Sequence, residues 1–221
     1  NDDIFVGYRY YDTFGVDVSY PFGYGGSYTS FAMSTKSVKA DKDKVTVQVK
    51  VKNTGTVSGK EVAEVYFSAP EGNLDKPYQE LAGYAKTDEL APGESQVLTI
   101  TYDTTEMGSY DTDKAAYVME DGDYIIRVGN SSRNTHVAGK ISVAEDTITE
   151  QYSNLMVPVK DNPNVADDEK YPTLEPMTTE GATPITYDGE ADEIAAASTI
   201  AVDFTGYKAP EIIKENEDVD V

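Results

Sequence analysis

The sequence predicts an all-β protein, a sandwich of two β-sheets, and three observations support this prediction. Valine alternates with polar residues over residues 45–51, which is the period of a strand with one buried and one solvent-facing side. Segments of this kind recur along residues 28–145, and residues that favour turns separate them. A strand pair cannot bury its apolar face alone, so a second sheet has to cover it.

The strand at residues 45–52 is followed by a second strand at residues 62–69. Asn53-Thr54-Gly55 ends the first strand, since Asn and Gly tolerate the positive φ of tight turns. In the second strand Phe67 belongs to one apolar face, and Tyr66 adds apolar surface to the other face. We expect the two strands to pair with each other.

Further short strands are predicted on either side of this pair. They are residues 28–38 and the alternating sets Leu98, Ile100 and Tyr102; Tyr124, Ile126 and Val128; and Val137, Ile141 and Val143. Residues 71–90 are expected to form a long loop. About seven short strands in about 115 residues indicate a β-sandwich of the immunoglobulin or fibronectin type III kind. Tyr124 is the candidate for a tyrosine corner, in which the hydroxyl supports folding.

The candidate core residues are the inward-facing members of these strands. They are Val47, Val49, Val65, Phe67, Leu98, Ile100, Tyr124 and Ile126.

Residues 1–31 concentrate aromatic side chains on a glycine-containing backbone. Six of the 17 tyrosines and four of the six phenylalanines lie here, and five glycines predict that no stable helix forms. Such rings need a surface to pack on, either a neighbouring domain or the sandwich itself. A second interpretation is a carbohydrate platform, because sugar faces stack on aromatic rings.

Residues 146–221 differ from the rest of the chain in charge and in pattern. They hold 18 acidic and 4 basic residues, a net charge of −14, and six of the 10 prolines. The pattern predicts one short helix at residues 192–201, followed by Phe204 as a candidate anchor. Little apolar surface is available to offset the entropy of ordering, so we expect a linker held by few contacts.

The composition of the chain argues against two classes of binding partner, nucleic acids and membranes. The 221 residues carry a net charge of −22, which repels nucleic acid and anionic membranes. No apolar run approaches the ~20 residues of a membrane span, so we expect a soluble protein. The lack of cysteine excludes disulfides and thiol chemistry, and it is compatible with a cytoplasmic or a secreted protein. The start at Asn1, within an aromatic segment, predicts a piece of a longer chain.

Few side chains are candidates for metal or acid–base chemistry. His136 is the only histidine and has no sequence partner for a triad or a zinc site, so we expect a structural role. The acidic residues at 161–169 lack the spacing of a calcium loop, and we expect neither a metal nor a cofactor.

Several stretches of the sequence carry motifs of one known protein family. Gly7-Tyr8-Arg9-Tyr10-Tyr11-Asp12 and the stretch from Tyr20 to Phe31 closely resemble the family's GYRYYD…PFGYGLSYT segment. Residues 49–66, VKVKNTGTVSGKEVAEVY, are similar to its NTG…GKEV…Y strand pair. Residues 68–85, SAPEGNLDKPYQELAGYA, are similar to its P…L.KP.KEL.GF loop. These motifs resemble those of glycoside hydrolase family 3, and the likeness covers more than half of the chain.

The resemblance implies a division of the chain into three parts. Residues 1–27 would be an aromatic linker from a preceding catalytic domain, residues 28–145 a fibronectin type III-like β-sandwich, and residues 146–221 an acidic, proline-containing tail or interdomain linker. The implied function is a non-catalytic module that braces the catalytic domains of a β-glucosidase-like enzyme, which hydrolyses terminal β-glycosidic bonds. The implied partners are those catalytic domains. The alternative is an accessory module in which the aromatic segment, or the loop at residues 71–90, contacts an oligosaccharide.

The family's catalytic residues have no counterpart in this sequence. In the family, the nucleophile is an aspartate of a TIM-barrel domain and the acid/base is a glutamate of an α/β-sandwich domain. Neither domain is recognisable here, so we expect no catalysis by the chain itself. Gly26 stands where the family usually has Leu. One family subgroup places the barrel after the fibronectin-like domain, and residues 146–221 would suit that connection.

The candidates for contact with another domain or with carbohydrate lie in the aromatic segment. They are Tyr8, Arg9, Tyr10, Tyr11, Asp12, Phe22 and Tyr24. Arg9 and Asp12 are the polar pair that we expect to meet a partner domain.

Overall fold

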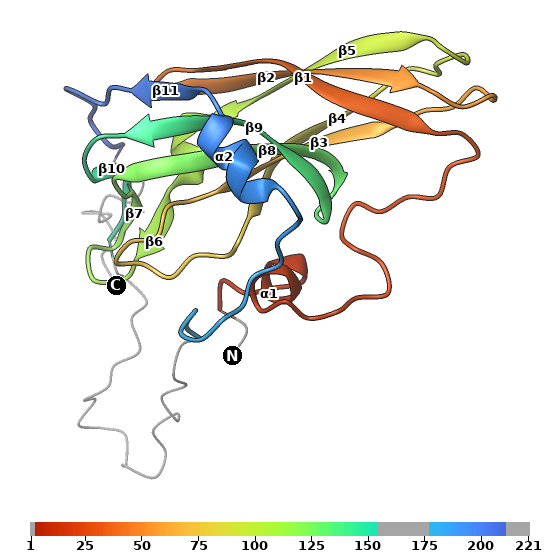
Figure 1. The fold of residues 1–221 in the computed structure, drawn as a ribbon. Helices are drawn as coiled ribbons and strands as arrows, with labels where there is room; N and C mark the ends of the chain where they lie inside the picture. Colours follow the sequence, from red (N-terminus) through yellow and green to blue (C-terminus); the bar gives the residue numbers. More distant parts are fainter. Residues whose placement is uncertain (1–2, 154–176, 211–221) are drawn as a thin grey trace, which may run out of the picture.

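The structure is a computed structural model, and it describes residues 3–153 and 177–210. Two β-sheets pack face to face in these residues, and a smaller third sheet lies at one end of them (Figure 1). The predicted all-β sandwich is confirmed.

The first sheet has the strand order β1–β2–β5, and all its pairs are antiparallel. Its strands are β1 (Phe31–Ala40), β2 (Lys44–Asn53) and β5 (Ser95–Asp103). The four valines at positions 45, 47, 49 and 51 are fully buried, as the alternation predicts. The first strand begins at Phe31 and not at Tyr28, whose side chain is exposed.

The second sheet has the strand order β11–β9–β8–β3–β4. Its strands are β3 (Val62–Ser68), β4 (Glu80–Lys86), β8 (Gly122–Ser131), β9 (Asn134–Val143) and β11 (Thr199–Val202). The expectation of an unbroken loop over residues 71–90 is wrong, because β4 lies within that range and pairs with β3. The edge strand β11 runs parallel to β9, and the other pairs are antiparallel.

The predicted pairing of β2 with β3 is also wrong, since the two strands belong to opposite sheets. The connection between them crosses from one sheet to the other. Asn53 is fully buried, and its side-chain amide donates to the carbonyls of Val57 and Leu90, both at 2.8 Å. These bonds fix a wide bend where a tight turn would have produced a hairpin.

The core between the two sheets contains all eight residues that the sequence proposes for it. Tyr124 is fully buried, and its hydroxyl donates to the carbonyl of Glu120 at 3.2 Å. A bond from a strand-start tyrosine to the backbone a few residues upstream is the arrangement of a tyrosine corner.

The third sheet has the order β10–β7–β6. Its strands are β6 (Ser109–Asp111), β7 (Ala116–Met119) and β10 (Thr147–Gln151), and the 3₁₀ helix η1 (Thr104–Met107) precedes them. Met107 and Met119 are fully buried and belong to the core, so this end of the sandwich is closed by packed side chains.

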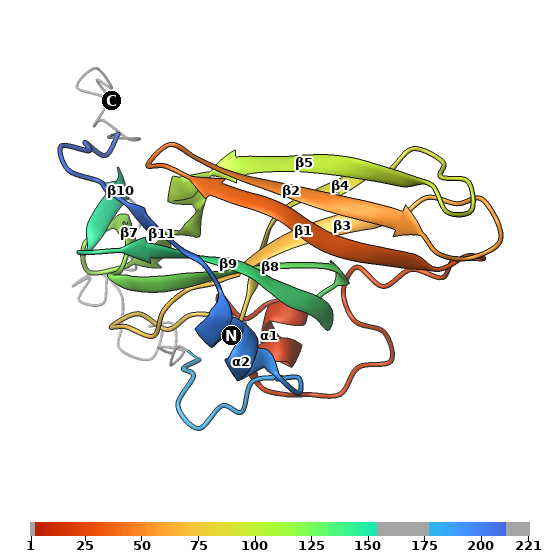
Figure 2. The same ribbon diagram turned by 45° about the horizontal axis from the view of Figure 1, so that its top comes forward.

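Strand β3 is buried on both faces, and the reason is the alternation of its side chains. Val65 and Phe67 belong to the core between the sheets. Glu64 and Tyr66 project from the other face of the strand. Two short helices, α1 (Tyr8–Thr13) and α2 (Glu190–Ala196), lie on that outer side of the five-stranded sheet (Figure 2).

Helix α1 contradicts the expectation that the glycines prevent a helix near the N-terminus. Gly7 and Gly15 lie at its two ends and have φ values of 61° and 63°, so they delimit the helix instead of interrupting it. Phe14 donates its N–H to the carbonyl of Tyr10 at 3.0 Å and closes the last turn.

The described part of the C-terminal region also differs from the expectation. The predicted helix at residues 192–201 is α2, which ends at Ala196, and β11 follows it. Phe204 is 9% exposed and packs in the core, as its proposed role of anchor requires. The expectation of few contacts is therefore wrong for the described residues of this region. The acidic residues at 161–169 lie outside the described residues.

Candidate functional site

The incoming segment, residues 3–30, is fastened to the sandwich by ion pairs at α1. Asp12 is 1% exposed, and its carboxylate accepts from Arg133 Nε at 2.9 Å and from Gln79 Nε2 at 3.3 Å. Arg9 Nη1 lies 3.1 Å from Glu80 Oε2 at the start of β4. Burial raises the pKa of the Glu80 carboxyl, and Arg9 partly opposes that rise. Arg9 and Asp12 thus bind groups of this chain.

Tyr8 connects the incoming segment to the outer face of the five-stranded sheet. Its hydroxyl accepts from the N–H of Leu81 at 2.8 Å, and burial raises its pKa. Its ring stacks on Phe22 with centroids 4.7 Å apart and meets Tyr66 edge to face at 6.0 Å. Offset-stacked and edge-to-face pairs of this kind add to the stabilisation from area burial.

A buried carboxylate lies next to this aromatic contact. Glu64 is 6% exposed and accepts a hydrogen bond from the Tyr66 hydroxyl at 2.6 Å. Burial raises the pKa of the Glu64 carboxyl, and the bond from Tyr66 partly opposes that rise. A Cβ at Gly23 would lie 2.3 Å from Glu64 Oε1, so the backbone at Gly23 approaches the carboxylate closely. Gly23 also has a φ of 81°, a backbone conformation that favours glycine.

An aromatic cleft of about 230 Å³ opens on the incoming segment. It is lined by Tyr8, Tyr11, Asp12, Val18, Tyr20, Pro21 and Phe22. Four of the seven candidate residues therefore come together here. Tyr24 lies beside the cleft, stacked on Tyr20 at 5.2 Å. Arg9 and Tyr10 do not line the cleft, and the Tyr10 ring packs on Phe14 at 4.9 Å.

Sequence reasoning missed four residues of this site. Tyr20 lines the cleft, and Arg133, Gln79 and Glu80 hold α1 in place. Tyr20 belongs to the same aromatic run as the candidates and could have been chosen with them. The pairing of Arg133 with Asp12 joins residues far apart in the chain, and no local pattern marks it.

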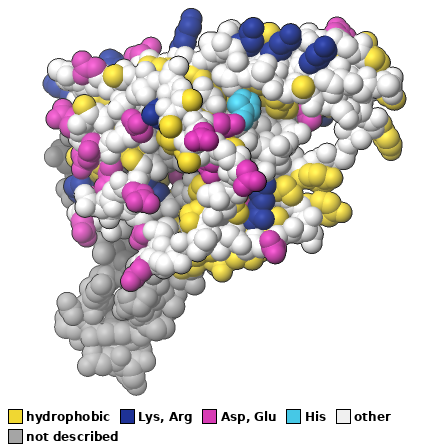
Figure 3. All heavy atoms as spheres, viewed as in Figure 1, with side chains coloured by type: hydrophobic (Ala, Val, Ile, Leu, Met, Phe, Trp, Pro, Cys, Tyr) yellow, Lys and Arg dark blue, Asp and Glu magenta, His cyan; other side chains and the backbone are white. Residues whose placement is uncertain are grey.

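The rim of the aromatic cleft presents large apolar rings to solvent. Tyr20 is 72% exposed, Tyr24 57% and Phe22 45%. Figure 3 shows hydrophobic side chains gathered over the segment that leads from α1 to β1. We call Tyr20, Phe22, Tyr24 and Tyr28 the aromatic surface. Large exposed rings gathered in one segment are typical of an interaction surface.

A buried ion pair lies on the same outer face of the sheet. Arg127 of β8 and Glu190 of α2 are 2% and 5% exposed, and Arg127 Nη1 lies 2.5 Å from Glu190 Oε1. The Tyr78 hydroxyl donates to the same carboxylate oxygen at 2.5 Å, and the guanidinium lies 4.8 Å from the centre of the Tyr78 ring. The charge on Arg127 is thus compensated by a residue of the C-terminal region.

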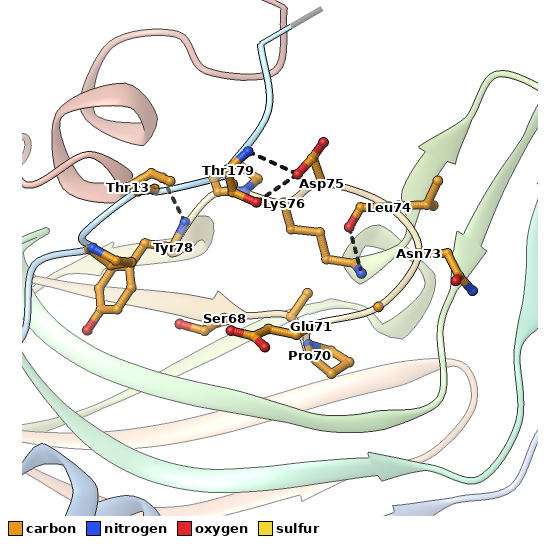
Figure 4. Close-up of a pocket in the computed structure, with 15 residues that line it drawn as sticks. Thr13, Ser68, Pro70, Glu71, Asn73, Leu74, Asp75, Lys76, Tyr78 and Thr179 are labelled. Carbon is orange, nitrogen blue, oxygen red and sulfur yellow. Dashed lines mark hydrogen bonds between the residues drawn. The ribbon is translucent and has the colours of Figure 1, made fainter.

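A cavity of about 470 Å³ lies between residues 68–78 and residues 179–184. Figure 4 shows Thr179 bonded to Asp75 on one side of the cavity, with Ser68 and Glu71 on the opposite side. Lys76 and Glu120 form a buried ion pair beside it. Burial would raise the pKa of Glu120, but the bonds from Lys76 and from the Asn73 N–H together hold it below its usual value. Many of the polar groups that line the cavity pair with one another. The cavity therefore marks the contact between residues 68–78 and residues 179–184.

Within residues 3–153 and 177–210, no group of three or more His, Cys, Asp or Glu side chains could hold a metal ion. His136 Nε2 lies 2.9 Å from Thr35 Oγ1, and burial lowers the pKa of its imidazole. The contact joins β9 to β1 and fits the structural role expected for it. No helix in the described part of the chain is long and apolar enough to cross a membrane.

Comparison with known proteins agrees with the β-sandwich described above. The model of the fibronectin type III-like domain matches residues 61–132. Beta-glucosidase A of Butyrivibrio fibrisolvens is 39% identical over 204 residues, which are 80% of this chain and 25% of that protein. The beta-glucosidase of Ruminococcus albus is 43% identical over 164 residues, which are 72% of this chain and 17% of that protein.

Solved structures of β-glucosidases share the fold. The enzyme from Paenibacillus barengoltzii is 47% identical with a TM-score of 0.68, over 72% of this chain and 19% of that chain. Beta-glucosidase 3B from Thermotoga neapolitana, in complex with α-D-glucose, is 46% identical with a TM-score of 0.63, over 66% of this chain and 20% of that chain. This chain spans a quarter or less of each of these proteins. It contains a fibronectin type III-like domain of the kind found in glycoside hydrolase family 3 β-glucosidases and corresponds to one region of these longer enzymes.

Proposed function

We propose that the chain is a non-catalytic structural module of a β-glucosidase-like enzyme, and that the aromatic surface binds the catalytic domain that precedes it. The observation that carries this proposal is the contrast within the incoming segment. Tyr8 and Asp12 fix the segment on the sandwich, whereas Tyr20 and Tyr24 remain largely exposed. A fixed backbone that displays exposed rings costs little further ordering entropy when a partner binds.

The length of the relatives supports an intramolecular partner. This chain matches 25% of the Butyrivibrio protein and 19% of the Paenibacillus chain, so further domains belong to enzymes of this kind. A catalytic domain joined through residue 1 would be held close to the aromatic surface by the connection itself. Its effective concentration would be high, and a modest interface would suffice.

The test uses the full-length parent enzyme and the isolated chain in parallel. Tyr20→Ala with Tyr24→Ala should lower the melting temperature of the parent enzyme, because each buried ring contributes about 1.5–3 kcal/mol. The same double change should leave the isolated chain almost unaffected. Tyr84→Ala is the control, since Tyr84 of β4 is 70% exposed and lies outside the incoming segment. Equal melting shifts in the two proteins, or no shift in the parent enzyme, would refute the docking role.

A second candidate function is contact with carbohydrate at the aromatic cleft. Its volume of about 230 Å³ and its tyrosine walls favour this function. Ligand sites are lined mainly by apolar and aromatic side chains, and the faces of sugar rings stack on aromatic rings. Titration of the isolated chain with a cello-oligosaccharide, followed by NMR, tests it. Chemical-shift changes at Tyr8 and Tyr11 that disappear in Tyr20→Ala would support binding, and unchanged spectra would exclude it.

A further inference from the structure

Helix α1 is too short to be stable without external contacts. It spans six residues, and its N-cap residue Gly7 makes no side-chain capping bond. Isolated helices shorter than about 12–15 residues are marginal in water. The cleft residues Tyr8, Tyr11 and Asp12 lie on this helix. The shape of the aromatic cleft therefore depends on what holds α1 in place.

One contact to α1 comes from the return segment, which we define as residues 177–207. The N–H of Ile185 donates to the backbone carbonyl of Asp12 at 2.9 Å. The Asp12 carboxylate is already held by Arg133 and Gln79. The same residue is thus bound from both sides, by the sandwich through its side chain and by the return segment through its backbone.

The fit between the return segment and the end of α1 is close. A Cβ at Gly15 would lie 2.5 Å from the carbonyl oxygen of Thr183, which leaves no space for a side chain. Gly15 also has a φ of 63°, a conformation that favours glycine. The return segment passes directly over the turn that follows the helix.

Two anchors hold the return segment on either side of this contact. On the C-terminal side, Glu190 pairs with Arg127 and accepts from the Tyr78 hydroxyl. On the N-terminal side, Asp75 Oδ1 accepts from the N–H of Thr179 at 3.0 Å and from its hydroxyl at 2.7 Å. The N–H of Tyr78 donates to Thr13 Oγ1 at 2.8 Å, so the loop that carries one anchor also binds α1 directly.

We propose that residues 177–190 act as a clasp that holds α1 against the sandwich, so that the aromatic cleft keeps its shape only while the clasp is closed. The clasp couples the segment that enters the sandwich to the segment that leaves it. Its consequence for the docking of a preceding domain rests on the function proposed above. The effect of the clasp is measured at α1 itself, and that measurement does not depend on the proposed function.

Hydrogen exchange of the isolated chain 1–221, followed by mass spectrometry, tests the clasp. The amides of Tyr10, Tyr11 and Phe14 are hydrogen-bonded within α1 and report on it. Ile185→Pro removes the N–H that binds Asp12, and Ile185→Ala is its matched control because it keeps that N–H. We expect exchange in a peptide covering α1 to accelerate at least about tenfold in Ile185→Pro relative to Ile185→Ala. Exchange in β3 should not change.

A second pair of variants acts on the anchor. Glu190→Ala should accelerate exchange at α1, whereas Asp192→Ala, an exposed position of the same helix, should not. If Glu190→Ala also accelerates exchange in β3, the whole fold is affected and Ile185→Pro decides the matter. Faster exchange at residues 177–190 with wild-type exchange at α1 would overturn the proposal. If the clasp is intact but the aromatic surface does not dock in the full-length enzyme, only the proposed function is contradicted.

Discussion

Arg127 of β8 and Glu190 of α2 form a buried ion pair across the outer face of the five-stranded sheet, with Nη1 and Oε1 2.5 Å apart. Arg127 lies within residues 61–132, which match the fibronectin type III-like domain, and Glu190 lies beyond them. A guanidinium that is 2% exposed needs a counter-charge, and here the C-terminal region supplies it.

The first prediction concerns this pair. Glu190→Ala should lower the free energy of unfolding by ~3–5 kcal/mol, because it leaves Arg127 buried without a partner. The double change Arg127→Met with Glu190→Leu should recover most of that loss, since apolar residues of similar size do not need compensation. Urea unfolding of the three proteins measures both effects. A double variant no more stable than Glu190→Ala would show that the pair contributes more than mutual neutralisation.

The second prediction compares two aromatic residues. Phe67 is 4% exposed between the sheets, so Phe67→Ala should cost ~3–5 kcal/mol from lost burial and the cavity left behind. The Tyr10 ring packs on Phe14 and Tyr11 within the incoming segment, so Tyr10→Ala should cost only ~1 kcal/mol. Thermal melting of both variants as isolated chains decides. Equal destabilisation would place Tyr10 in the cooperative core.

The third prediction concerns pH. Burial raises the pKa of the Glu64 carboxyl in the folded state. As the pH increases, this carboxyl therefore loses its proton at a lower pH in the unfolded chain than in the folded chain. The contribution of Glu64 to stability is complete below its usual pKa of 4.5 and is lost as the pH rises through the folded-state pKa. Glu64→Gln keeps an acceptor for the Tyr66 hydroxyl and carries no charge. Its melting temperature relative to the wild type should therefore be higher at about pH 7 than at about pH 4. A constant difference would mean that the Glu64 pKa is not raised.

The fourth prediction tests the tyrosine corner. Tyr124→Phe removes the hydroxyl that donates to the Glu120 carbonyl and should lower the free energy of unfolding by ~1 kcal/mol. Tyr84→Phe is the matched control, because that side chain is 70% exposed and should be neutral. Equal unfolding midpoints for the two variants would remove Tyr124 from the corner.

The fifth prediction concerns catalysis. No carboxylate pair of this sequence stands in the context of the family's nucleophile and acid/base, so the isolated chain should not hydrolyse aryl β-glucosides. We expect the aryl group to be released from the glucoside only at the rate of the uncatalysed reaction. Turnover above that rate, abolished by a point change within this chain, would contradict it.

Several features could be predicted from the sequence because they depend on local patterns. The alternation of Val45 to Val51 gives β2 its buried face, and the Asp41 side chain closes the turn before it through bonds to Asp43 and Lys44. The core set and the bond of Tyr124 follow from the same period and from the position of a tyrosine at a strand start. The family resemblance of the aromatic segment was also visible, because consecutive residues carry it.

Other features were decided by the tertiary structure, because they depend on which distant groups meet. The sequence places β2 and β3 next to each other, but the bonds of Asn53 send the chain into the opposite sheet. The glycines around α1 predict an irregular segment, whereas contacts from Arg133 and Ile185 hold a helix there. Dense charge in the C-terminal region predicts few contacts, yet Glu190 finds a buried arginine and Phe204 reaches the core. Periodicity records which side of a strand is apolar, and it carries no information on the identity of the element that covers it.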